Sequence, residues 1–414
     1  MLSLPRNQFR FGLKVLLGLA LSLTMLISLA SPAPSQPAIA GSPELRGVWL
    51  TTVDSDVLFS RDRLQPALQK LASLHFNTVY PAVWNWGYTL YPSQTAETAI
   101  GYAVDPRVPN LQDWDALANV VELGHQQGLS VMPWFEFGFM TTAESEIVNT
   151  HPKWITERSD GSQIWQDGRY QRRWLNPFKP EVQQFIQSMI LEIVTHYDID
   201  GIQFDDHFGL PAEFGYDEFT VRLYQQEHGG QSPPLNPDNP EWVRWRANKI
   251  TRFMTQIFRA VKARKPGVVI SLAPNNYPFS YHHYLQDWQA WEQQGLIEEL
   301  ILQVYSGNLD NFIADLSRPE VRIAKQHIPV SVGILTGLKD LFVPIHQVEE
   351  QVWAVRDRNF SGVSFFFYET LWNLTGTERD AQVDGKAERQ AVFSRLFNAS
   401  ASIPNLMDNW VPPD

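Results

Sequence analysis

The sequence His196-Tyr-Asp-Ile-Asp-Gly-Ile-Gln-Phe-Asp-Asp-His-Phe208 indicates the end of a helix, a turn and a strand that finishes on two adjacent carboxylates. Asp200-Gly201 makes the turn, and the apolar run after it suits a buried strand. Two acids at a buried strand end are costly, because each raises the pKa of the other and burial adds to the rise. A strand that served only the core would end on an apolar residue. The pair therefore predicts a functional site, with a helix-capping Asp followed by a solvated Asp as the structural alternative.

Seven further segments have the pattern of buried strands, and helical segments separate them. The expected strands are 44–52, 76–83, 129–136, 199–206, 268–273, 299–305, 328–334 and 362–369. The expected helices are 61–74, 113–127, 180–196, 241–264, 284–294, pieces of 309–326, 343–359 and 387–397. Strands that alternate with helices favour parallel pairing, so eight such units predict an α/β fold of the (β/α)8 TIM-barrel type. A doubly wound open sheet is the rival, but Arg46-Gly-Val-Trp49 lacks the Gly-rich phosphate turn typical of that fold.

Two of the loops after the expected strands are long. Residues 137–178 follow strand three, and residues 207–240 follow strand four. Loops of this length inside a compact domain are usually functional, so we expect long βα-loop insertions at these two places. The expected organisation is a signal peptide with a Pro-rich spacer at 1–40, a barrel domain at 41–402 and a polar tail at 403–414.

The N-terminal segment has the features of an export signal. Basic residues precede an apolar run from Val15 to Ala30, and Ala38-Ile39-Ala40 has the small-x-small form of a cleavage site. The run is shorter than the roughly 20 residues of a membrane-spanning helix, although an uncleaved anchor is the alternative. We therefore expect a secreted or periplasmic protein of the cell envelope, with no stable membrane insertion after cleavage.

Composition narrows the classes of partner. The net charge is -12 and no basic stripe stands out, which argues against nucleic acid. The chain has no Cys, which excludes disulfides, a catalytic thiol and a Cys-zinc site. The 15 Trp, 13 Tyr and 24 Phe supply aromatic surface of the kind that stacks on sugar rings.

The active face of a (β/α)8 barrel lies at the carboxyl ends of its strands. Three acids expected there are candidate catalytic residues: Asp206, Asp205 and Glu136. The candidate substrate-binding residues at the same ends are Trp84, Trp86, Trp134, His207, Asn275, Tyr305 and Glu369. Acids, amides and large aromatics are the chemistry of a glycosidase, in which one carboxylic acid protonates the leaving oxygen and a second group meets the oxocarbenium-like centre. The structural alternatives are a salt bridge from Glu136 to Arg172 or Arg173, and Trp84 and Trp86 as a cover for the barrel.

Five motifs carry a family resemblance: Arg46-Gly-Val-Trp-Leu-Thr-Thr52, Phe76-Asn-Thr-Val-Tyr-Pro-Ala-Val-Trp84, His151-Pro-Lys-Trp154, Trp174-Leu-Asn-Pro177 and Asp200-Gly-Ile-Gln-Phe-Asp-Asp-His-Phe208. In this order, over about residues 44 to 375, they resemble the bacterial glycosyl hydrolase-like ten family. The resemblance implies a (β/α)8 glycoside hydrolase of the cell envelope, and some relatives are linked to cleaving peptidoglycan glycan strands stripped of their peptides. It implies Asp205 and Asp206 as the catalytic acids, with Glu136 as a helper.

The fourth-strand motif is also distantly similar to the Asp-Gly-x-Asp-x-Asp-x-Glu motif of chitinase-type barrels, in which a substrate acetamido group is the nucleophile. Gln203 stands in place of the first inner acid and His207 in place of the terminal Glu, so that mechanism does not transfer directly. Alternation along a strand points Asp205 and Asp206 to opposite faces. Both enter one site only if the strand has ended or bulged there. Otherwise Glu136 or Glu369 is the second acid.

We therefore expect a secreted glycoside hydrolase that acts on an envelope or extracellular polysaccharide by carboxylate general acid catalysis, with peptidoglycan-type glycan strands as the substrate. The prediction includes no cofactor and no metal. One alternative is a barrel that binds glycan without cleaving it, because aromatics serve either role. Another is a metal-dependent polysaccharide hydrolase or deacetylase with Asp205, Asp206 and His207 as ligands.

Overall fold

The computed structural model describes residues 42–372, 385–405 and 410–413, all within one compact unit. The expected signal segment, residues 1–40, lies outside the described residues. Within the described part of the chain, no helix has both the length and the apolar character needed to cross a membrane.

The central sheet is a closed parallel barrel. Its order is β5-β2-β1-β16-β13-β12-β11-β10-β6. The strands are β1 (Leu45–Leu50), β2 (Thr78–Pro81), β5 (Ser130–Val131), β6 (Trp134–Phe135), β10 (Gly201–Asp205), β11 (Val269–Ala273), β12 (Glu299–Gln303), β13 (Val330–Leu335) and β16 (Gly362–Phe366). Every neighbouring pair in this sheet is parallel.

The barrel closes through its third strand, which is split into β5 and β6. Pro133 lies between the two pieces and has no N–H to donate to a ladder, but its carbonyl accepts from the Gln203 backbone N–H at 2.8 Å. β5 pairs with β2, and β6 pairs with β10. The sheet therefore begins and ends in the same strand, which confirms the predicted α/β barrel with eight strand positions.

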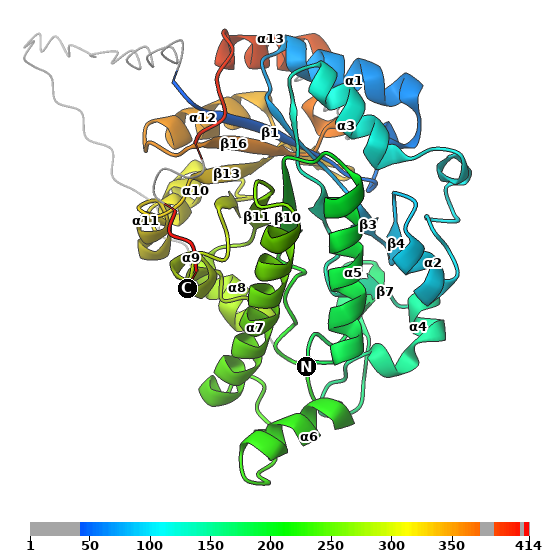
Figure 1. Cartoon of the computed structure of the whole chain (residues 1–414). Helices are drawn as coiled ribbons and strands as arrows, with labels where there is room; N and C mark the ends of the chain where they lie inside the picture. The colour runs from blue at the N-terminus through cyan, green and yellow to red at the C-terminus, as the bar shows by residue number, and fades with distance from the viewer. Residues whose placement is uncertain (1–41, 373–384, 406–409, 414) are drawn as a thin grey trace, which may run out of the picture. The chain divides into compact units, whose positions relative to one another are not determined.

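Each barrel strand is followed by at least one helix, and Figure 1 shows these helices around the strands. The covering helices are α1 (Arg61–Ser73), α3 (Ala116–Gln126), α5 (Pro180–His196), α7 (Pro240–Arg264), α9 (Trp288–Gln293), α10 (Leu309–Leu316), α11 (Pro319–Ala324), α12 (Ile345–Arg356) and α13 (Lys386–Leu396). In α5 the buried residues recur at helical spacing, from Val182 through Phe185, Ile186 and Met189 to Ile193. A stripe of this kind buries one face of the helix, and each such side chain contributes about 1.5–3 kcal/mol.

The helix expected at residues 284–294 is interrupted in the structure. The segment 284–294 is not a single helix, because α8 (Tyr277–Tyr284) ends at its first residue. Leu285 adopts a left-handed conformation with φ 53°, and Asp287 then caps α9 by accepting from the Ala290 N–H. The apolar spacing continues across this break, but the backbone does not.

The loops after the second, third and fourth strands contain elements of their own. After β2 come the antiparallel pair β3 (Trp84–Asn85) and β4 (Tyr88–Thr89), then α2 (Gln94–Ile100) and η2 (Pro109–Gln112). After β6 come β7 (Met140–Thr142), α4 (Glu146–Thr150), η3 (Pro152–Trp154), β8 (Trp165–Asp167) and β9 (Tyr170–Trp174). The order β7-β9-β8 makes a small antiparallel sheet there. The loop after β10 holds α6 (Glu218–Glu227).

Shorter elements occupy other strand ends. They are η1 (Val57–Phe59) after β1, β14 (Gly337–Leu338) and β15 (Leu341–Phe342) after β13, and η4 (Glu369–Leu371) after β16. At the C-terminus, Trp410 packs 6.1 Å from Phe258 and its Nε1 donates to the Gly295 carbonyl at 3.1 Å. The described part of the expected polar tail thus contacts the barrel helices.

A chain of hydrogen bonds crosses the barrel interior below the acids. Trp49 Nε1 donates to Gln203 Oε1 at 2.7 Å, and Gln203 Nε2 donates to Ser271 Oγ at 2.9 Å. Ser271 Oγ and the Tyr80 hydroxyl both donate to Glu299 Oε2, at 2.6 and 3.2 Å. Burial raises the pKa of Glu299 to about 7, against the effect of these two hydrogen bonds. Gln203 therefore belongs to the polar core of the barrel.

Candidate active site

The two adjacent acids of the fourth strand reach one place because the strand ends between them. β10 ends at Asp205, and Asp206 is the first residue beyond it. Phe204 faces the other way and packs 4.5 Å from Phe208. The Oδ1 atoms of Asp205 and Asp206 lie 3.5 and 3.4 Å from Nδ1 of His207. The condition that the strand must have ended for both acids to share a site is met.

Asp205 is the more deeply held of the two, with an exposed fraction of 3%. Its carboxylate accepts from Trp134 Nε1 at 2.9 Å, from the Asp206 backbone N–H at 2.7 Å, and from Gln303 Nε2 at 3.4 Å. Burial, followed by the charge and the hydrogen bond of Asp206 and the charge of Glu136, raises the pKa of Asp205 well above its ordinary value. This rise is expected where two carboxyl groups share one buried site, because the negative charge of one opposes ionisation of the other.

Asp206 is held from the fifth strand. Asn275 Nδ2 donates to Asp206 Oδ2, and the Asn275 carbonyl in turn accepts from Ser280 Oγ and Trp288 Nε1 at 3.0 and 3.1 Å. The neighbouring Asn276 has a different task, because its side chain caps α8 by accepting from the Phe279 N–H. Of the two amides that end the fifth strand, Asn275 is thus the one in the site.

Glu136 follows β6 and is buried without the salt bridge considered for it. Its Oε2 accepts from Asn85 Nδ2 at 2.6 Å and from Thr51 Oγ1 at 3.1 Å. Arg172 forms its ion pair with Asp167 instead, at 3.3 Å. Burial raises the pKa of Glu136 to about 8, opposed by the Thr51 hydrogen bond and the charge of Arg172. Glu136 is therefore mostly protonated at pH 7 and able to donate a proton or a hydrogen bond.

His207 joins the ends of strands three and four. Its Nδ1 lies 2.9 Å from the Glu136 carbonyl oxygen, and the Phe139 N–H donates to the His207 carbonyl at 3.0 Å. Gly138 allows this approach, because a Cβ built there would lie 2.5 Å from the same carbonyl oxygen. The two acidic strand ends are thus tied into one rigid unit.

The expected aromatic residues fall into three groups. Trp84 is fully buried, donates to the Gly138 carbonyl at 3.0 Å and packs 5.8 Å from Phe185, so the structure does not place it on a substrate surface. Trp134 is buried as well and orients Asp205 through its N–H. Tyr305 is 38% exposed and packs 5.7 Å from Phe366. Burial of the hydroxyl group and the charges of Asp205, Asp206 and Glu136 raise the pKa of Tyr305, so the side chain is neutral beside the acids.

Trp86 and Glu369 lie at other strand ends. Trp86 is half-buried and lines a cavity beside the loop after β6. Glu369 begins η4, accepts from Ser55 Oγ at 2.6 Å, and has a pKa raised by burial. This contact joins the ends of the first and eighth strands.

The residues Asp205, Asp206 and His207 also satisfy the spacing of a metal cluster, with candidate ligand atoms within 4.8 Å of one another. A carbonyl oxygen can only accept, so the contact of His207 with Glu136 O requires a proton on Nδ1. That nitrogen is then not a ligand. The donor set therefore fits a hydrogen-bonded acid pair better than a metal centre built on Nδ1.

Several contributors were absent from the expected site. Thr51 and Asn85, which hold Glu136, follow the first two barrel strands, so the strand-end rule could have found them. Gln286 donates to the Asp205 carbonyl at 2.9 Å. It lies 81 residues further along the chain, and no local pattern marks it.

A closed parallel (β/α)8 barrel with buried acids at the carboxyl ends of its strands is an architecture typical of glycoside hydrolases. Residues 44–355 match the family described as Glycosyl hydrolase-like 10, and the chain belongs to this family. Among its relatives, "Glycosyl hydrolase DigH" of Escherichia coli (strain K12) is 26% identical over 321 residues, which are 66% of this chain and 69% of the relative. "Glycosyl hydrolase YngK" of Bacillus subtilis (strain 168) is 25% identical over 447 residues, 97% of this chain and 80% of the relative.

Solved structures share the fold at low sequence identity. The glycoside hydrolase domain of PgaB (BpsB) from Bordetella bronchiseptica superposes with a TM-score of 0.62 at 12% identity and covers 82% of this chain and 98% of that domain. The catalytic domain of β-amylase from Paenibacillus polymyxa gives 0.55 at 11% identity, covering 87% of this chain and 98% of that chain. These likenesses support the barrel assignment, and the family resemblance seen in the sequence motifs is confirmed.

Proposed function

We propose that this protein hydrolyses O-glycosidic bonds in an envelope or extracellular polysaccharide, with peptidoglycan-type glycan strands as the substrate and the exported, periplasmic or secreted protein as the working form. The Asp205–Asp206 pair at the end of β10 is the observation that carries the proposal. Membership in the family and the names of its relatives support the reaction class. The N-terminal export pattern and the sequence motifs support the location and the substrate.

The proposed division of labour follows from burial and hydrogen bonding. The Asp206 side chain is 10% exposed and that of Asp205 5%, so Asp206 lies nearer to a bound glycan. Asp206 gives the shared proton to the glycosidic oxygen while the bond to the anomeric carbon breaks. The negative charge that remains on the pair, stabilised by the three donors to Asp205, lies close to the oxocarbenium-like centre. Water then adds to the anomeric carbon and returns a proton to the pair.

Glu136 and Tyr305 complete the proposed site. Glu136, protonated at neutral pH, donates a hydrogen bond to a hydroxyl or acetamido oxygen of the substrate. The exposed ring of Tyr305 supplies apolar surface for a sugar face. Both roles concern binding and orientation, and the proton that the leaving oxygen takes comes from the acid pair.

The test is mass spectrometry of the products formed from peptide-free peptidoglycan strands, with chitin oligomers and α- and β-glucans in parallel. Asp205→Asn and Asp206→Asn should each lower turnover by at least about 100-fold, as expected for loss of general acid catalysis. Asp198→Asn, a change at a side chain that is 85% exposed, is the matched control and should retain activity.

The other outcomes discriminate the alternatives. Products from a different polymer alone would overturn the proposed substrate and keep the reaction. Saturable binding with no product from any polymer would indicate a glycan-binding barrel. Activity lost with a chelator and restored by a divalent cation would indicate a metal-dependent hydrolase.

A further inference from the structure

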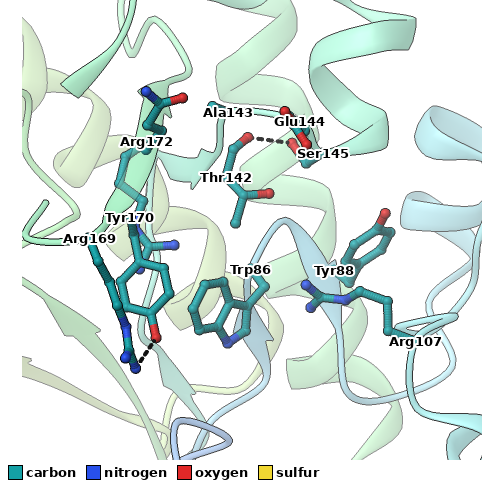
Figure 2. A pocket seen from close by; sticks show the side chains of 11 residues that line it. Trp86, Tyr88, Arg107, Thr142, Ala143, Glu144, Ser145, Arg169, Tyr170 and Arg172 are labelled. Atoms are coloured by element: carbon teal, nitrogen blue, oxygen red, sulfur yellow. Dashed lines mark hydrogen bonds between the residues drawn. The ribbon is translucent and has the colours of Figure 1, made fainter. Parts of the chain in front are cut away.

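A concave feature lies between the loops that follow β2 and β6. It is a cavity of about 480 Å³. Its walls include three arginines and three aromatic side chains: Arg107, Arg169, Arg172, Trp86, Tyr88 and Tyr170. Figure 2 shows the guanidinium of Arg172 between the rings of Tyr170 and Trp86, with Tyr88 and Arg107 on the opposite wall.

The cavity adjoins the candidate active site through Trp86. This residue follows Asn85, whose amide holds Glu136, and its ring packs 5.6 Å from that of Phe137, the residue after Glu136. The positive charge of Arg172 also acts on the Glu136 carboxyl group, where it opposes part of the rise in pKa that burial causes. The cavity wall thus includes the residue next to Asn85, the holder of Glu136.

Arg172 is the main reason to expect a ligand there. Arg172 is only 5% exposed. Its guanidinium carbon lies close to three aromatic rings, at 4.5 Å from the ring centre of Trp86, 4.8 Å from that of Tyr170 and 5.0 Å from that of Phe137. Nε faces Asp167, but Nη1 is buried and has no hydrogen-bond partner among the described residues. An unsatisfied buried guanidinium N–H is costly, and it leaves the charge of Arg172 incompletely compensated at a wall of the cavity, where an anion would be favourable.

The charge balance of the lining favours an anion. Among the lining residues, all of which are described, Glu144 is the single acid against three arginines. Arg107 is partly offset by Asp105, to which it donates from Nε at 2.8 Å. Arg169 is exposed, and its Nη2 donates to the Tyr170 hydroxyl at 2.8 Å. Arg169 and Arg172 thus present guanidinium groups from neighbouring positions along one loop and strand.

We propose that this cavity is a subsite for a carboxylate-bearing sugar unit of the glycan. The guanidinium groups of Arg172 and Arg169 bind the carboxylate, since planar guanidinium groups match its geometry. Tyr170, which is 37% exposed, and the half-buried Trp86 contact the sugar ring. The inference rests on the proposed function and deepens it, because it specifies that the polysaccharide is acidic next to the bond that is cut.

The experiment compares acidic glycans with their carboxyl-reduced forms. The probes are peptide-free peptidoglycan strands and polyuronate oligosaccharides, each with and without reduction of the carboxylates to alcohols. Binding is measured by calorimetry on the full chain carrying Asp206→Asn, so that turnover plays no part. We expect at least one acidic probe to bind about tenfold more tightly than its reduced form.

Arginine variants then locate the recognition. On the same background, Arg169→Met and the conservative Arg172→Lys should each remove most of that preference while leaving affinity for the reduced probe unchanged. Arg222→Met, an exposed arginine on α6, is the control and should change neither affinity. Circular dichroism melting of each variant verifies that the fold is retained.

The results that would contradict the subsite differ from those that would contradict the proposed hydrolase activity. Equal affinity for acidic and reduced probes, no binding of either, or equal losses in the arginine variants on both forms would overturn the subsite. Preference for the acidic form, lost in the arginine variants, supports it even if the unmodified protein cleaves no glycan. In that case the hydrolase proposal alone fails.

Discussion

Trp134 Nε1 donates to Asp205 Oδ2 over 2.9 Å, so the third strand holds an acid of the fourth. Trp134→Phe preserves most of the buried ring and removes this donor. A hydrogen bond to a charged group is worth about 1.5–3 kcal/mol, so we expect kcat to fall roughly 10- to 100-fold with little change in KM. Steady-state kinetics on a cleaved glycan is the measurement. A change in KM alone would contradict the role assigned to Trp134.

Trp84→Phe is the matched control for that experiment. It also removes an indole N–H from a fully buried tryptophan, but that N–H serves the Gly138 carbonyl. We expect a loss of about 1–3 kcal/mol in the free energy of unfolding and nearly unchanged kcat. Comparable losses of kcat in both variants would show that the effect is general packing.

Glu136 should make stability and activity depend on pH in a recognisable way. Its pKa rises from 4.5 to about 8 on folding, so between these values the folded state holds a proton that the unfolded state has released. This group's contribution to stability is therefore fully present below pH 4.5. It declines as pH rises to about 8, by up to roughly 1.4 kcal/mol per pH unit.

Glu136→Gln removes that titration. In urea unfolding, the variant should lose less stability than the unmodified protein between pH 5 and pH 8. Glu299→Gln is the comparison, because the pKa of Glu299 is raised to about 7 in the same direction but this residue lies in the barrel interior. In activity profiles, only Glu136→Gln should move the alkaline limb near pH 8. Parallel pH slopes of stability in the Glu136 variant and the unmodified protein would contradict the buried, protonated state.

Asn275 and Asn276 offer a test with two adjacent residues of the same type. Asn275→Ala removes the donor to Asp206 Oδ2, so we expect kcat to fall about tenfold or more. Asn276→Ala removes the cap of α8 and should cost about 1 kcal/mol in the free energy of unfolding with kcat retained. Steady-state kinetics and thermal melting of both variants show which of the two residues acts in the site. The reversed pattern would place Asn276 in the site.

Tyr305 distinguishes stacking from hydroxyl chemistry. Because Tyr305 is 38% exposed beside the acids, Tyr305→Ala should raise KM about tenfold through loss of apolar contact. Tyr305→Phe keeps the ring and should remain within about twofold of the unmodified protein. A Phe variant as impaired as the Ala variant would assign the function to the hydroxyl group.

Sequence pattern was sufficient for the architecture because the relevant signals are local. Alternation of buried strands with helices predicted the closed barrel, and the strand-end position marked Asp205, Asp206 and Glu136 before any contact was known. The same local logic failed at 284–294, where apolar spacing continues through Leu285 although the backbone turns left-handed there. A periodic pattern indicates which side of a helix is apolar, but it does not indicate where one residue interrupts the helix.

Local sequence pattern is enough to predict the order of the strands, the end of the barrel at which the acids lie and the type of residue at each strand end. The role of each of these side chains depends on the contacts it makes in the folded protein. Trp84 and Trp86 are two residues apart, yet one is buried against Phe185 and the other lines an arginine-rich cavity. Burial, hydrogen-bond partners and the raised pKa of Glu136 depend on groups brought together from distant parts of the chain, such as Thr51 and Asn85. These contacts join residues far apart in the chain, and no local sequence pattern encodes such pairs.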